Sequence, residues 1–285
     1  MDVGVYIFPT DQTIDPIELA TTTEGHGFES LWFPEHSHIP TSRVTPWGGR
    51  EGAPPLPDFY ARTHDPFVAL GACAAVTTTL KLATGICLVA QRDPIHTAKE
   101  VASVDSLSKG RMILGVGYGW NKEEMAQHGT AYGRRRDLLR ENILAMKALW
   151  TQDEASYDGD LVSIEPSWAW PKPTQTPHPP IVLGGAAGPK TAAHIAEFCD
   201  GWMPIGGRNL EAGWAEVRSA CEAIDRDPAT VEFGVFGAPD DPEKLEALAE
   251  QGLSRAVFTL PQGTRDEVLA ELERLAPLVE RMAGV

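Results

Sequence analysis

A regular alternation of strand-like and helix-like segments is the feature that most constrains how this chain can fold. Eight short apolar runs are each followed by a segment whose apolar residues recur with a helical period. Eight such units within 285 residues predict an α/β fold of the (β/α)8 TIM-barrel type. The strands are expected at residues 3–8, 29–33, 80–89, 112–116, 181–183, 201–204, 231–236 and 255–260.

A doubly wound parallel sheet is the alternative arrangement of alternating strands and helices. That fold normally carries a glycine-rich dinucleotide fingerprint after its first strand. Here the first strand ends in Phe8-Pro9-Thr10-Asp11, which contains no glycine, so the barrel is favoured. The helices are expected at 16–25, 66–76, 95–107, 122–128 together with 134–150, 190–198, 210–224, 242–251 and 265–282.

Two segments are too long to be simple connections and predict insertions into the barrel. The polar, Gly- and Pro-rich stretch 34–63 follows the second strand. Residues 155–170 predict a hairpin with Asp158-Gly159 as its turn, and a proline-rich connector leads from there to the fifth strand. Nothing in the sequence divides the chain, so a single domain over residues 1–285 is expected.

Composition excludes several classes of partner. The formal net charge of −16 argues against nucleic acid and anionic membranes, because both require a basic face on the protein. A hydrophobic content of 42% suffices for a large core, and no apolar run approaches the length of a membrane span. We therefore expect a cytoplasmic protein whose partner is a small-molecule substrate.

The four cysteines carry no recognisable metal or redox motif. Cys73, Cys87, Cys199 and Cys221 form no CxxC pair and have small or apolar neighbours. Buried reduced thiols are therefore favoured over a disulfide or a redox role.

In a TIM barrel, functional residues follow the C-terminal ends of the strands. The second strand is followed by Glu35-His36-Ser37-His38, and the fourth by three glycines in alternate positions and then Trp120. His36 and His38 could form a metal pair, but no further histidine or carboxylate follows a later strand where a metal barrel needs it, so we predict no metal. A proton-transferring His36 is favoured, with Trp120 either an aromatic wall or part of a tight packing contact.

The loop after the fifth strand, 184–191, has the properties of a phosphate site. Its glycines allow close approach of a ligand, Pro189 suits the first turn of a helix, and a helix start offers free N–H groups. An ordinary strand-to-helix turn is the alternative. The run Arg134-Arg135-Arg136 is expected to be a solvated face, although it could attract an anionic tail.

Four long blocks resemble the luciferase-like monooxygenase superfamily, specifically its branch of coenzyme F420-dependent oxidoreductases. They are FESLWFPEHSHIP (28–40), LATGICLVAQRDPIHTAKEVASVDSLSKGRMILGVGYGW (82–120), PPIVLGGAAGPKTAAHIAEFCDGWMP (179–204) and RAVFTLPQGTRDEVLAELERL (255–275). Together they span nearly the whole chain in order. The barrel expected from this family agrees with the count of strands and helices.

The resemblance implies a deazaflavin across the mouth of the barrel and assigns residues to it. A cis peptide at Gly85-Ile86 would support the ring, and Glu35 and His36 match the acid–histidine pair of the family. The chain departs from the sugar-phosphate dehydrogenase type, which carries a glutamate where Gly119-Trp120-Asn121 stands here, and Glu123 is not expected to replace it. The remaining cofactor contacts implied are Tyr118, Trp120, Gly184, Gly185, Ala186, Ala187, Gly188 and Thr191.

The resulting prediction is an oxidoreductase that transfers a hydride between coenzyme F420 and an unidentified small organic substrate, with His36 moving the proton. The loop 43–63, with Trp47, Phe59 and Tyr60, is expected to act as a lid or pocket wall, or else to be an ordered insertion or a dimer contact. An FMN-dependent monooxygenase on the same fold is the first alternative, and a non-catalytic ligand-binding barrel the second. The family also suggests a homodimer.

Overall fold

A computed structural model describes residues 1–206 and 209–284 of the chain. Its strands form a closed, entirely parallel barrel in the order β1-β10-β9-β8-β7-β4-β3-β2. The predicted TIM barrel is therefore confirmed. The barrel strands are β1 (Asp2–Tyr6), β2 (Ser30–Phe33), β3 (Lys81–Thr84), β4 (Met112–Val116), β7 (Ile181–Gly184), β8 (Gly201–Met203), β9 (Glu232–Phe236) and β10 (Arg255–Thr259).

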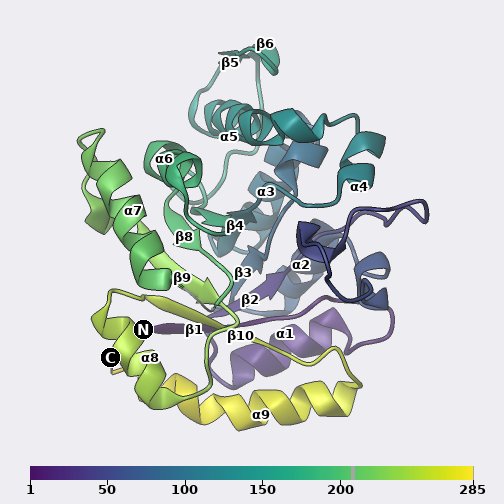
Figure 1. Cartoon of the computed structure of the whole chain (residues 1–285), viewed down its shortest axis with the longest axis vertical. Helices are drawn as coiled ribbons and strands as arrows, with labels where there is room; N and C mark the ends of the chain where they lie inside the picture. Colours follow the sequence, from purple (N-terminus) through teal and green to yellow (C-terminus); the bar gives the residue numbers. More distant parts are fainter. Residues whose placement is uncertain (207–208, 285) are drawn as a thin grey trace.

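The helices surround the barrel as an outer ring (Figure 1). Four of them begin at an Asp-Pro pair, in which the aspartate accepts N–H groups of the first turn and proline takes the first helical position. Among the described residues, no helix is long and apolar enough to span a bilayer. The helices are α1 (Pro16–Gly25), α2 (Pro66–Val76), α3 (Pro94–Leu107), α4 (Lys122–Gln127), α5 (Arg135–Thr151), α6 (Pro189–Phe198), α7 (Leu210–Glu222), α8 (Pro242–Glu250) and α9 (Arg265–Met282).

Both insertions lie where the sequence predicts them. The segment after β2 contains two short 3-10 helices, Trp47–Gly49 and Asp58–Ala61. The hairpin of β5 (Ala155–Asp158) and β6 (Ser163–Ser167) projects from the barrel next to α5 (Figure 1). Its connection is longer than the predicted two-residue turn, because Glu141 of α5 accepts the backbone N–H groups of residues 161 and 162 and so holds them out of the strand.

The interior of the barrel is filled by large side chains. Trp32 is fully buried, its ring lies edge-on to Phe236 with the ring centroids 5.2 Å apart, and its indole N–H donates to the hydroxyl of Ser30. At the N-terminal end of the strands, the buried Arg255 forms ion pairs with Glu29 and Glu232. The barrel is therefore a packed core with its charged closure at the end opposite the expected site.

Strand β3 is shorter than predicted. It ends at Thr84 rather than at residue 89, and the peptide between Gly85 and Ile86 is cis. The cis bond agrees with the family resemblance, whereas the strand length does not agree with the apolar pattern. The reason is local packing: a Cβ on Gly115 of β4 would lie 2.0 Å from the backbone oxygen of Thr84, so the two strands approach too closely for a regular continuation.

All four cysteines are free and buried. Burial raises the pKa values of the thiols of Cys73 and Cys199, to about 12 in the case of Cys73. The prediction that the cysteines are buried and unpaired is thus confirmed, and the raised pKa values disfavour the reactive thiolate form.

Candidate active site

His36 lies at the C-terminal end of β2 and is held by a carboxylate that the sequence did not reveal. Its Nδ1 is 2.8 Å from Oε2 of Glu124 on α4, and Glu124 is fully buried. Because Nδ1 is engaged, Nε2 is the nitrogen left for a ligand. Asn121 at the N-cap followed by Glu124 at the third helical position is a capping-box spacing. This spacing is the sequence signal that marks Glu124, but it predicts a contact with the helix start, whereas Glu124 in fact reaches His36.

Glu35 lies beside His36 in sequence but faces a different part of the molecule. One of its carboxylate oxygens accepts the backbone N–H of Leu88 at 2.7 Å, and the other accepts Nε of Arg92 at 2.6 Å. Arg92 also pairs with Asp65 and Glu100. These contacts fix the loop after β3 against the loop after β2, and a catalytic role for Glu35 stays a prediction.

His36 and His38 do not converge on a common point. His38 contacts Gln127 through Nε2 and the hydroxyl of Ser37 through Nδ1, whereas His36 contacts Glu124. Within residues 1–206 and 209–284, no three His, Cys, Asp or Glu side chains are arranged to hold a metal ion. Both histidines instead attach the loop after β2 to the short helix α4.

Glu123 has a different function from its neighbour Glu124. Its Oε1 accepts the backbone N–H groups of Val44 and Thr45 at 3.0 and 3.1 Å. Although partial burial opposes ionisation, these bonds and one from the Thr45 hydroxyl lower the pKa of Glu123 to about 2. Residues 43–63, which we call the mouth loop, are thereby anchored to α4.

The mouth loop covers His36 with aromatic rings. The centroid of the Tyr60 ring lies 5.0 Å from that of His36, and the Trp120 ring lies 5.8 Å from it. Tyr60 also packs on Phe59 and Trp47. His36 is consequently only 8% exposed. The mouth loop and Trp120 thus pack against His36, while the loop as a pocket wall and Trp120 as an aromatic wall over a flat ring stay predictions.

The residues predicted to support the cofactor ring lie together at the top of the barrel core. Ile86 packs between two glycines: a Cβ on Gly117 would lie 2.2 Å from its side chain, and one on Gly184 would lie 3.1 Å from it. A Cβ on Gly85 would lie 3.0 Å from Trp32 in the core. Of the alternate glycines, Gly117 gives Ile86 its space, and a Cβ on Gly119 would lie 2.4 Å from Met125 of α4, so close packing of helix and barrel accounts for part of their spacing.

The loop after β7 leads into α6 without any side chain occupying the helix start. Gly185 has φ +111° and is exposed together with Ala186, while the N-cap residue Gly188 offers no capping side chain. The first-turn N–H groups of α6 are thus available to an anion. Ala187 is half-buried beside them and Thr191 is buried one turn into the helix.

Tyr118 connects the loop after β4 to α6. Its hydroxyl lies 2.9 Å from Nδ1 of His194, and burial raises the pKa of Tyr118 to about 12, so the phenol stays neutral. Burial also lowers the pKa of His194 to about 4. The contact between them therefore joins two uncharged groups at neutral pH.

The arginine run at the start of α5 is only in part the solvated face that the sequence indicated: Arg134 is exposed and pairs with Asp137, whereas Arg135 and Arg136 are half-buried. The guanidinium of Arg136 lies 4.7 Å from the Tyr118 ring centroid, and that of Arg135 lies 3.7 Å from the Tyr132 ring. Within the described part of the chain, neither has a carboxylate at ion-pair distance, whereas Asp137 next to them pairs with Lys190 in the first turn of α6. Aromatic stacking therefore holds uncompensated positive charge beside the α6 N-terminus.

Comparisons with known proteins agree with this geometry. The family model described as luciferase-like monooxygenase matches residues 9–279. The fold superposes on the monooxygenase RslO1 from Streptomyces bottropensis with a TM-score of 0.79, 17% identity and coverage of 99% of this chain and 100% of that one.

Three relatives differ in what is known of them. An uncharacterized protein of Mycobacterium tuberculosis is 42% identical, over 97% of this chain and 98% of its own. The FMNH(2)-dependent dimethylsulfone monooxygenase of Pseudomonas putida is 29% identical, over 72% of this chain and 57% of its own. The F420-dependent hydroxymycolic acid dehydrogenase of Mycobacterium tuberculosis is 27% identical, over 80% of this chain and 60% of its own. The match of the family model along almost the whole chain shows that this protein belongs to the luciferase-like monooxygenase family.

Proposed function

We propose that this protein is an oxidoreductase that transfers a hydride between coenzyme F420 and a small, largely apolar organic substrate. The observation that carries the proposal is the buried His36–Glu124 pair after β2, which lies at the same end of the barrel as the uncapped start of α6 after β7. Hydride transfer to or from an organic substrate is accompanied by a proton, and an imidazole with an unperturbed pKa near 6.5 suits that exchange. Family membership supports the oxidoreductase class.

The residues present fit a phosphate-bearing flavin or deazaflavin. The uncapped N-terminus of α6 and the exposed Gly185 offer backbone N–H groups to a phosphate, and Arg136 adds a positive charge without a carboxylate partner in the described chain. Ile86, seated between Gly117 and Gly184, provides an apolar support at the barrel mouth for a flat ring. When bound, F420 supplies the ring carbon that gives or accepts the hydride.

The side chains of this protein position the substrate and handle its proton. Glu124 holds Nδ1 of His36, so that Nε2 can take a proton from, or give one to, the substrate. Tyr60, Phe59 and Trp47 exclude water and favour an apolar substrate body. Glu35 and Arg92 keep the loops after β2 and β3 in register, which fixes the height of His36 above the barrel.

Two observations bear on the choice between F420 and FMN. The blocks that resemble the family point to its F420-dependent branch, and Arg135 and Arg136 extend the positive charge beyond a single phosphate. The FMN-dependent alternative is supported by the Pseudomonas putida relative, whose name gives reduced FMN as its cofactor. The helix start of α6 would accept the phosphate of either molecule.

Titration of the purified protein with F420 and with FMN tests the proposal. Tight binding of F420 and weak binding of FMN are expected, followed by F420-dependent turnover of one or more members of a panel of alcohols and carbonyl compounds. His36→Ala should lower turnover by roughly 10²- to 10⁴-fold with little change in F420 affinity. His38→Ala is the matched control, because among the described residues the side-chain contacts of His38 are with Gln127, Ser37 and the His128 ring. Tight FMN binding without F420 binding would reverse the assignment.

We further propose that the protein is a cytoplasmic homodimer. Large apolar side chains are exposed on two neighbouring helices: Val68 on α2 is 74% exposed and Leu107 on α3 is 68% exposed. Ile95, near the start of α3, is also exposed. Light scattering after gel filtration should give twice the mass of the 30.9 kDa chain. A monomeric mass would refute the dimer without bearing on the proposed chemistry.

A further inference from the structure

We propose that Glu124, Asn121 and Gln91 form a proton path that connects His36 to solvent from the side opposite the substrate. The proposal rests on the proposed function only in taking His36 as the group that exchanges a proton with the substrate. It assigns these three residues a role that goes beyond fixing the orientation of the imidazole.

His36 is almost closed to solvent, with 8% of its surface exposed. The rings of Tyr60 and Trp120 lie 5.0 and 5.8 Å from the His36 ring, and Glu123 holds the mouth loop in place above it. A substrate and a cofactor ring bound at the mouth would cover the same side. A proton taken up by His36 during turnover therefore needs another way out.

Glu124 receives that proton directly but cannot pass it to bulk water. Its Oε2 contacts His36, it is fully buried, and its Oε1 has no hydrogen-bond partner among the described residues. A buried carboxylate is costly unless it is paired, so Glu124 and His36 share charge and proton as a unit. Oε1 is the atom through which a proton can leave this unit.

Asn121 places two more unpaired polar atoms next to Glu124. It occupies the N-cap position of α4, yet its side chain makes no capping bond to the helix. Its Nδ2 and Oδ1 are both buried without a partner in the described chain. Residues three apart at a helix start face the same side, so the Asn121 side chain lies on the face of α4 that carries Glu124. An amide with a free donor and a free acceptor is suited to binding an ordered water.

Gln91 extends the polar atoms from α4 towards the outside. A Cβ on Gly119 would lie 3.6 Å from Nε2 of Gln91, so the Gln91 amide packs against the segment that leads into Asn121. This Nε2 is likewise buried without a partner among the described residues. Buried polar groups are almost always satisfied by protein or by ordered water. Three side chains with unpaired buried atoms around the start of α4 thus mark a place for bridging waters.

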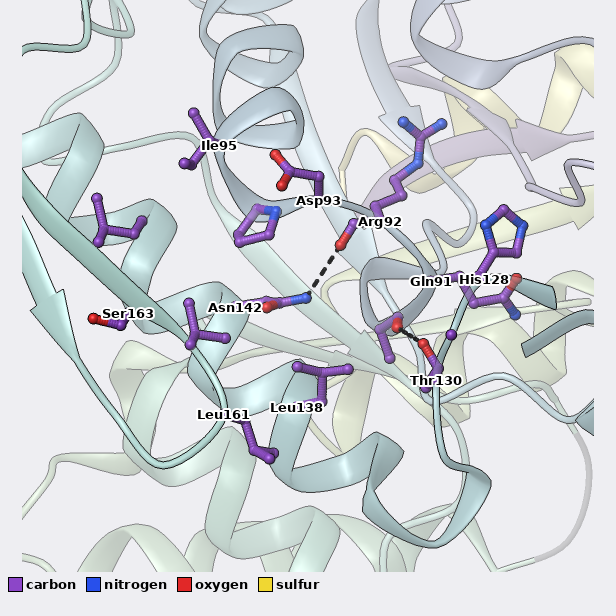
Figure 2. A pocket seen from close by; sticks show the side chains of 15 residues that line it. Gln91, Arg92, Asp93, Ile95, His128, Thr130, Leu138, Asn142, Leu161 and Ser163 are labelled. Carbon is purple, nitrogen blue, oxygen red and sulfur yellow. Dashed lines mark hydrogen bonds between the residues drawn. The ribbon is translucent and has the colours of Figure 1, made fainter. Parts of the chain in front are cut away.

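Gln91 also lines a cavity of about 440 Å³ that lies outside the barrel. Gln91 and Thr130 form one side of this cavity, and Leu161 and Ser163 of the hairpin segment form the other (Figure 2). Its volume is many times the ~30 Å³ that one water occupies in the liquid, and Leu161 and Ile95 at its lining are exposed to solvent. The cavity therefore brings solvent to within one side chain of the buried polar atoms.

The proton count balances along this path. When the substrate is oxidised, Nε2 of His36 takes one proton and Nδ1 gives one to Glu124. The carboxyl group then turns and gives one proton to the water held by Asn121, and Gln91 orients the next water towards the cavity. No electron moves along the path. Oxidation leaves Glu124 ionised and His36 neutral with its proton on Nε2, and Nδ1 regains a proton when the transfers run in the opposite direction. Reduction of a substrate runs the same transfers in reverse.

Asn121→Leu tests the path, because leucine fills a similar volume and removes two unpaired polar atoms, a change that costs little stability. We expect turnover to fall roughly 10- to 100-fold, the solvent deuterium isotope effect on kcat to rise, and cofactor affinity to stay the same. In the cofactor-free protein, NMR should show slower exchange of the His36 Nδ1 proton with solvent. Gln127→Leu is the control on the same helix, since Gln127 contacts His38 alone among the residues discussed.

Unchanged exchange of the His36 proton in Asn121→Leu would overturn the path even if turnover fell, because that pattern indicates a purely structural effect. Gln91→Leu repeats the test at the cavity and decides the matter if Asn121→Leu fails to fold. If the wild-type protein shows no F420-dependent turnover, the proposed function fails, whereas the NMR measurement still reports on the path. The two hypotheses can thus fail separately.

Discussion

Replacing Arg136 with methionine should weaken the binding of a phosphate-bearing cofactor without disturbing the fold. Arg136 stacks on Tyr118 with its guanidinium 4.7 Å from the ring centroid, and within the described residues it has no carboxylate to neutralise it. Methionine keeps the length and apolar contact of the side chain while removing the charge. The change therefore isolates the electrostatic contribution of one residue.

The expected loss of cofactor affinity follows from the contact that Arg136 would make with a phosphate. A hydrogen bond between charged groups contributes about 1.5–3 kcal/mol, which corresponds to a factor of roughly 10 to 150 in Kd. Arg136 is only half-buried, so the lower end of that range applies, and we expect about tenfold weaker binding. Arg140, one turn further along α5, already pairs with Glu197. Arg140→Met should therefore change Kd by less than about twofold.

Fluorescence titration of the two variants and the wild type, at low and at moderate salt, measures these effects. Salt should weaken binding to the wild type more than binding to Arg136→Met, because screening acts on the charge that the variant lacks. Equal affinity in the wild type and Arg136→Met, or equal losses in both variants, would refute the assignment of Arg136 to the phosphate site.

Three further predictions concern stability and substrate selection. Arg255→Met leaves Glu29 and Glu232 without their buried cation, which should cost about 3–5 kcal/mol of folding stability and lower the melting temperature by about 10 °C at pH 7. Because burial already raises the pKa of Glu232, this loss of stability should shrink towards pH 5 as the carboxylates take up protons. A loss of stability that does not depend on pH would contradict this explanation. The pKa of His194 is about 4 in the folded protein, below its ~6.5 in the unfolded chain, so the unfolded state binds the proton first. The stability of the fold therefore falls as the pH falls from ~6.5 to about 4. In thermal melts, the melting temperature of His194→Gln should decline less over that interval than that of the wild type. Tyr60→Ala should raise KM for apolar substrates roughly tenfold with unchanged cofactor Kd, and a change in Kd alone would remove Tyr60 from the substrate wall.

The parts of the fold that depend on local sequence could be predicted closely. The bounds of α2, α9 and β4 are those predicted, because an Asp-Pro pair, a capping box and a dense apolar run each act within a few residues. The early end of β3 could not be predicted, since it depends on how closely Gly115 on the next strand approaches Thr84. Apolar periodicity carries no information about that distance.

In the candidate site, too, local features could be predicted and contacts between distant segments could not. The position of His36 after the end of β2 could be predicted, because the place of a residue at a strand end is a local property of a barrel. Glu124 could not, because it lies 88 residues away in sequence and becomes its partner only when α4 packs over the barrel mouth. The stacking of Arg136 on Tyr118 likewise joins two segments whose contact no spacing rule predicts.

The two adjacent glutamates of α4 bind opposite parts of the site, and this limits how the protein can evolve. Glu123 fixes the mouth loop and Glu124 fixes the imidazole, so one helix of six residues determines the position of both. A new mouth loop that loses the Glu123 contact would shift α4 and, with it, the imidazole of His36. Substrate preference can therefore diversify readily at the tip of the loop, around residues 50–58, whereas the Val44–Thr45 attachment has to change together with α4.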